Sequence, residues 1–170
     1  MKNIFLTPMK KVTLLTTMLL MHWMLTAATY TWTGATSTDW NVGTNWSAGF
    51  PGLAALLSTD VLVVPNAGST LNDPSTLSAG ISSAAFTRLT LNGNAIAIVP
   101  ANLVLNLTDL TNASGVNTGN GSALTIDGTL NVTIRTTAAI VNGGGTLTVT
   151  TNGVISITNP TVVNGDGIRN

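Results

Sequence analysis

Short runs of alternating aliphatic and small polar residues recur between residues 89 and 157. An alternation with a period of two places the aliphatic side chains on one face of a β-strand and the polar side chains on the other. Asn and Gly between the runs favour tight turns, and few residues here favour helices. The pattern therefore predicts an all-β fold with strands at 89–91, 96–98, 103–107, 124–126, 130–134, 147–149 and 155–157.

The runs also repeat along the chain. At an offset of 23 residues, one set of aliphatic positions matches a second set: Leu124, Ile126, Val132 and Ile134 match Leu147, Val149, Ile155 and Ile157. A turn signature recurs at intervals of 25 and 22 residues, as Val116-Asn117, Val141-Asn142 and Val163-Asn164. Such an interval suits one coil of a β-solenoid, whose aliphatic face is buried only when coils stack. A β-sandwich is the alternative, but its strands are usually longer and more widely spaced.

The first 28 residues have the pattern of a secretory signal peptide. Lys2, Lys10 and Lys11 precede an apolar run at 12–25, and small residues at 26–28 offer a cleavage site, most simply after Ala28. The run has 14 residues, whereas a membrane span needs about 20. We expect an exported protein at the cell surface or outside the cell, with no membrane span once the leader is removed; a retained anchor helix is the alternative.

Composition outside this leader excludes several kinds of chemistry. The remainder contains no Lys, His, Cys, Glu, Gln or Met, and its three Arg against six Asp give a net charge of −3. No basic patch is available for nucleic acid, and zinc has no His or Cys ligand. We therefore expect no enzyme activity, no catalytic residue and no cofactor. Ca²⁺ at residues 164–167 and a polysaccharide enzyme using paired Asp residues are the weaker alternatives.

Aromatic residues gather in the segment that follows the leader. Residues 29–66 hold five of the six aromatic residues outside the leader: Tyr30, Trp32, Trp40, Trp46 and Phe50. The series Trp32-Thr33-Gly34, Asp39-Trp40, Asn45-Trp46, Pro51 and Asp60-Val61-Leu62-Val63-Val64-Pro65 resembles the opening of many secreted bacterial β-helix proteins. These include autotransporter passengers and surface proteins exported by the type IX system. The resemblance implies a right-handed parallel β-helix with an adhesive or structural role.

Trp32, Trp40 and Trp46 suggest a cap over the first coil, because an uncovered solenoid end exposes core side chains and strand edges. Residues 60–65 would then be the strand that enters the first coil. The alternative is that the three rings form an exposed platform on which surface glycans stack.

Two further sets of residues are candidate surfaces. Thr90, Thr125 and Thr148 occupy equivalent triplets and are expected to form an outward ladder, which Thr133 and Thr158 extend. Such an array can bind ice or glycans, although Thr is also simply a good exposed strand residue. Residues 165–168 align at an offset of 22 with residues 143–146. Asn164, Asp166 and Ile168 are therefore expected at an end of the solenoid available for assembly.

These expectations combine into one organisation: a signal peptide at 1–28, a Trp-rich capping segment at 29–66 and solenoid repeats at 67–170. The expected function is that of a structural or adhesive surface protein that associates with itself through its solenoid ends, head to tail in a filament. A carbohydrate-binding module and a truncated passenger fragment of a larger adhesin are the alternatives.

Overall fold

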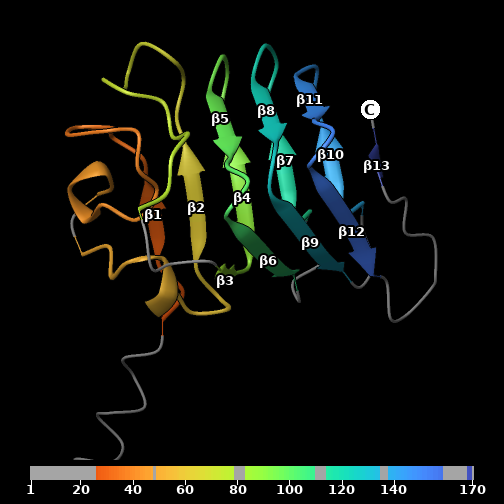
Figure 1. Cartoon of the computed structure of the whole chain (residues 1–170), viewed down its shortest axis with the longest axis horizontal. Helices are drawn as coiled ribbons and strands as arrows, with labels where there is room; N and C mark the ends of the chain where they lie inside the picture. Colours follow the sequence, from red (N-terminus) through yellow and green to blue (C-terminus); the bar gives the residue numbers. More distant parts are fainter. Residues whose placement is uncertain are drawn as a thin grey trace, which may run out of the picture.

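The chain forms a β-solenoid of about three coils (Figure 1). Each full coil contributes one strand to each of three sheets, and the strands within each sheet are parallel. This is a computed structural model, and it describes residues 26–47, 49–78, 83–109, 114–134, 138–158 and 168–169. The all-β fold and the parallel stacking expected from the repeats are confirmed. Most of the expected signal peptide lies outside the described residues.

Each sheet contains one strand from each of the three full coils β4–β6, β7–β9 and β10–β12, and β1, β2, β3 and β13 extend two of the sheets. The six-stranded sheet contains, in spatial order, β1 (Thr29–Thr31), β2 (Val61–Val64), β4 (Arg88–Leu91), β7 (Val116–Thr118), β10 (Ile140–Asn142) and β13 (Ile168–Arg169). The three-stranded sheet contains β5 (Ile96–Val99), β8 (Ala123–Ile126) and β11 (Thr146–Val149). The four-stranded sheet contains β3 (Ser83–Phe86), β6 (Val104–Asp109), β9 (Thr129–Ile134) and β12 (Val154–Thr158). Two short 3₁₀ helices, η2 (Gly43–Asn45) and η3 (Leu53–Ala55), precede β2.

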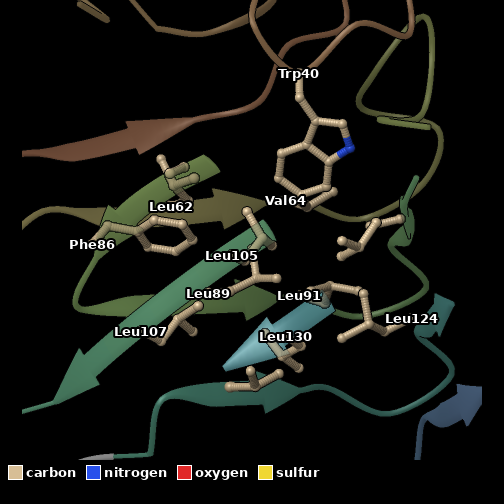
Figure 2. Packing of buried hydrophobic residues seen from close by; sticks show 14 of the residues in the cluster. Trp40, Leu62, Val64, Phe86, Leu89, Leu91, Leu105, Leu107, Leu124 and Leu130 are labelled. Atoms are coloured by element: carbon tan, nitrogen blue, oxygen red, sulfur yellow. The ribbon is translucent and has the colours of Figure 1, made fainter. Parts of the chain in front are cut away.

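Stacked aliphatic side chains fill the interior of the solenoid. Leu105 pairs in register with Leu130, and Leu130 pairs with Ile155 on the next coil. Leu105 and Leu130 are fully buried, as are the neighbouring side chains that Figure 2 shows stacked below Trp40. Burial of such side chains is the main favourable contribution to folding, and one coil alone could not provide it.

The expected repeat register is correct for one pair of strands and wrong for the next. Leu124 pairs with Leu147 and Ile126 with Val149, as the offset of 23 predicts. Val132, however, pairs with Ile157 instead of Ile155, at an offset of 25. The corner between β8 and β9 has two residues, 127–128, whereas the corner between β11 and β12 has four, 150–153. The longer corner adds the two extra residues without changing which face is buried.

The recurring Val-Asn signature belongs to strands, so its interpretation as a turn was wrong for the two described copies. Val116 and Asn117 lie in β7, and they pair with Ile140 and Val141 of β10. The register is thus one residue away from the Val116-to-Val141 match that the sequence predicts. Thr118, at the end of β7, is fully buried and donates its hydroxyl to Oδ1 of Asn142 at 2.8 Å. Residues 163–164 lie outside the described residues.

Candidate functional site

The three expected capping tryptophans form one buried cluster at the N-terminal end of the solenoid. The exposed fractions of Trp32, Trp40 and Trp46 are 0%, 0% and 4%. The rings of Trp32 and Trp46 meet edge to face with centroids 5.0 Å apart, and Trp46 stacks on Phe50 at 4.9 Å. Rings this deeply buried present no face to a sugar. The cluster is therefore a cap, as the sequence predicts, and not a stacking platform.

Each indole N–H of the cluster is satisfied by a backbone carbonyl. Trp32 donates to Asn72 at 2.6 Å, Trp46 to Trp40 at 2.8 Å and Trp40 to Ile98 at 2.8 Å. A buried donor without a partner would cost about 1–3 kcal/mol. These bonds let the polar atoms of three large side chains enter the core, and the bond from Trp40 connects the cap to β5 of the first coil.

Asn45 holds the loop between the tryptophans, a role that the sequence analysis missed. Its side chain is fully buried. Its Oδ1 accepts from the backbone N–H groups of Thr36 and Ser37, both at 2.9 Å. Its Nδ2 donates to the Ser37 hydroxyl at 2.8 Å and to the Asp39 carbonyl at 2.9 Å. An Asn directly before a Trp in a Thr- and Ser-rich loop was the available signal.

The cap also covers the strand edges at this end of the solenoid. Both backbone groups of Ile98 in β5 face the cap: its N–H donates to the Pro74 carbonyl, and its carbonyl accepts from Trp40, both at 2.8 Å. η3 packs against β3, and Ser47 donates its N–H to the Thr31 carbonyl of β1. The N-terminal end of the solenoid is thus closed, with residues up to Thr76 taking part through a bridge to Asp39.

The C-terminal coil is open by comparison. Leu124 and Ile126 of β8 are fully buried, whereas Leu147 of β11 is only half-buried and the exposed fraction of Val149 is 46%. Ile155 and Ile157 of β12 are likewise half-buried, although they match fully or almost fully buried residues on the previous coil. Within the described ranges, β11 pairs only with β8 and β12 only with β9. As far as the described residues extend, this coil end presents apolar side chains and strand edges without an outer partner.

The expected threonine ladder is correct only in part. Thr125 and Thr148 pair in register on the outer face of the three-stranded sheet. Thr90 lies in the six-stranded sheet between Val63 and Asn117, so its place in that ladder was wrong. The reason is that a Leu-Thr-aliphatic triplet can form a strand in any of the three sheets, so the triplet alone does not show which sheet a strand joins.

A longer threonine row lies on the four-stranded sheet, where Thr108, Thr133 and Thr158 pair coil to coil. The expectation that Thr133 and Thr158 extend the ladder of Thr125 and Thr148 was therefore wrong, because they belong to a different sheet. Beside this row, Asn131 donates its Nδ2 to Oδ1 of Asn106 at 2.9 Å.

The expected assembly residues at the C-terminal end are only partly described. Asn164 and Asp166 lie outside the described residues, and so does the weaker Ca²⁺ candidate at 164–167. Ile168 begins β13, pairs with Ile140 and has an exposed fraction of 53%. Its expected alignment with Thr146 was wrong, because β13 joins the six-stranded sheet.

One carboxylate stands apart from the others. Asp60, directly before β2, has an exposed fraction of 1%. Its Oδ2 accepts from the backbone N–H of Leu57 at 2.8 Å, and its Oδ1 accepts from that of Ala28 at 2.9 Å. Burial and, second, the negative charge of Asp60 raise the pKa of Tyr30 above its ordinary value. The sequence predicts the position of Asp60 at the start of a strand but not its burial.

The described part of the chain has no group of three or more acidic, His or Cys side chains placed to hold a metal ion. No helix in that part is long and apolar enough to cross a membrane. No protein-family model matches the chain, and comparisons with curated proteins and with solved structures give no significant match.

Proposed function

We propose that this protein is an exported structural or adhesive component of the cell surface, and that it acts by joining its C-terminal coil to a second copy. The contrast between the two solenoid ends carries the proposal. One end is closed by the tryptophan cap, and the other presents half-buried aliphatic side chains on strands without an outer neighbour among the described residues. The leader sequence supports export.

The chemistry of the open edge supports association. Proteins usually protect exposed strand edges with Lys, Pro or other charged residues. Residues 146–158, which span β11 and β12, contain no charged residue and no Pro. Two copies of this end would therefore meet without repulsion between like charges, and each could cover the apolar side chains of the other.

The closed end selects the geometry of association. A head-to-tail filament needs an open surface at both ends of each subunit. The tryptophan cap occupies the N-terminal end, where it also satisfies the backbone groups of Ile98. Pairing of two C-terminal coils is the arrangement that this contrast favours. Each subunit would then present its cap outward.

The experiment compares the purified chain from Ala28 onward with its Val149→Lys variant by analytical ultracentrifugation over a range of concentrations. The unsubstituted chain (the parent) is expected to form dimers. The variant is expected to be monomeric, because the Lys side chain would place a positive charge in the interface between the two C-terminal coils. Ile96→Lys is the matched control. Ile96 is also an exposed aliphatic residue of the three-stranded sheet, with an exposed fraction of 43%, but it lies on β5 at the opposite edge.

A parent that stays monomeric at high concentration would contradict self-association. Fibres seen by electron microscopy would contradict the pairing of two C-terminal coils and favour the head-to-tail arrangement. Circular dichroism of all three proteins verifies that the Lys variants keep the fold. Mass spectrometry of surface and secreted fractions of the native cells separately tests export.

A further inference from the structure

Asp60 is a buried carboxylate whose charge has no cationic partner in the described part of the chain. Its two hydrogen bonds come from the neutral backbone N–H groups of Leu57 and Ala28. A buried carboxylate is costly unless it is paired with a cation and hydrogen-bonded. A positive charge at the nitrogen atom of Ala28 or Leu57 would therefore stabilise the buried carboxylate.

Ala28 is held at this position by a second bond. Its carbonyl accepts from the Val61 N–H at 2.8 Å, next to the bond from its own N–H to Asp60 at 2.9 Å. Ala28 is half-buried, whereas Thr26 and Ala27 are exposed. Among the described residues, the backbone hydrogen bonds of the N-terminal segment thus begin at Ala28, directly after the exposed residue Ala27.

We propose that Asp60 is the binding site for the α-ammonium group of Ala28, formed when the leader is cut between Ala27 and Ala28. In this hydrolysis, water adds across the peptide bond, Ala27 leaves with a new carboxylate, and the Ala28 nitrogen becomes an ammonium group. The nitrogen already lies 2.9 Å from Asp60 Oδ1. Cleavage replaces a neutral N–H donor by a cationic one, so attraction between opposite charges is added to the hydrogen bond that Asp60 already accepts.

This inference rests on the proposed export for the origin of the ammonium group, and it revises the cleavage position. Cleavage after Ala28, which the sequence suggests as the simplest, would remove both the N–H that Asp60 accepts and the carbonyl that Val61 contacts. Asp60 would then keep only the bond from Leu57 among those described. Cleavage after Ala27 preserves every described contact and adds the missing charge.

The binding test uses chains that begin at Ala28 with either a free or an acetylated α-amino group. Acetylation keeps an N–H donor and removes the charge. At about pH 6, below the ordinary α-amino pKa of about 8, acetylation is expected to lower the folding equilibrium constant on the order of 10- to 100-fold. In an Asp60→Asn background the effect should disappear. In the control Asp127→Asn it should persist, because Asp127 contacts Thr150 in a distant corner.

An acetylation effect that is absent, or equally large with Asp60→Asn, would overturn the proposal. Should Asp60→Asn fail to fold, titration of the free Ala28 amine by nuclear magnetic resonance decides: a pKa raised above the ordinary value is expected, and an ordinary or lowered value refutes the pair. N-terminal mass spectrometry of the exported protein should find Ala28 first; Thr29 first would refute the cleavage position. An exported chain that retains its leader would contradict cleavage, whereas a chain confined to the cytoplasm would contradict export.

Discussion

The indole N–H of Trp40 donates to the carbonyl of Ile98, 58 residues further along the chain, at 2.8 Å. Ile98 lies on β5, the edge strand of its sheet, and its N–H donates to Pro74. The Trp40 indole and the Pro74 carbonyl therefore make the two hydrogen bonds to Ile98 that a neighbouring strand would otherwise make. The cap stabilises this end of the solenoid by supplying hydrogen bonds as well as by covering apolar surface.

Substitution of Trp40 by Phe should destabilise the protein by about 2–4 kcal/mol. The smaller ring leaves space in a fully buried site, and the Ile98 carbonyl loses its indole donor. Chemical denaturation followed by circular dichroism measures the loss. Thr90→Val, on the half-exposed outer face of β4, should change stability by less than about 0.5 kcal/mol. Equal stabilities of the two variants would contradict a structural role for the bond.

Stability should fall at alkaline pH because of Tyr30. Burial and, second, the charge of Asp60 raise its pKa above the ordinary 10.0. The folded state then keeps the phenol proton at a pH where the unfolded state has lost it. This contribution is complete below about pH 10 and is lost as the pH rises through the pKa of the folded state.

The sequence contains a single tyrosine, so the ultraviolet absorbance of tyrosinate reports on Tyr30 alone. Urea denaturation between about pH 9 and pH 12 measures the loss of stability, and Tyr30→Phe should show a shallower decline. A folded-state titration midpoint at or below the ordinary value would contradict this prediction.

Gly128 should not tolerate a side chain, because it is buried in the corner between β8 and β9. A Cβ at this position would overlap the carbonyl oxygens of Pro100 and Leu103 on the preceding coil. Gly128→Ala is expected to cost about 1–3 kcal/mol, measured as a lower denaturation midpoint. Gly43→Ala is the control, because the nearest atom to its added Cβ is the Phe50 carbonyl oxygen at 3.8 Å. A cost no greater than that of the control would show that the corner relaxes easily.

Alternation alone was enough to predict most of the strands and the buried face of most of them. In β5 the predicted face was wrong, because Ala97 and Val99 are buried whereas Ile96 is exposed. It succeeded at Leu124 and Ile126, which are fully buried and pair with Leu147 and Val149. It failed for β7 and β10, whose short Val-Asn segments were interpreted as turns. A strand of three residues carries too little periodicity to be separated from a turn containing Asn.

The pairing of residues between coils and the sheet that each strand joins depend on corner lengths and on contacts between residues far apart in the sequence. A local pattern of aliphatic and polar residues does not predict them. The offset changes between β8 and β9 because their corner has two residues, and Thr90 and Ile168 belong to a different sheet from the expected one. The burial of Asp60 was also beyond local reasoning, because its partner Ala28 lies 32 residues earlier. The tryptophan cap was predictable because large rings concentrated before a solenoid have few other sites for burial.

The unequal corners have a practical consequence. The corner at 127–128 has two residues and its neighbours at 100–103 and 150–153 have four, yet the inward residues of the flanking strands remain aligned. Core alignment is thus independent of corner length, so a foreign peptide grafted between Thr150 and Gly153 should be displayed without disturbing the stacked interior. The protein is in this respect a natural display scaffold.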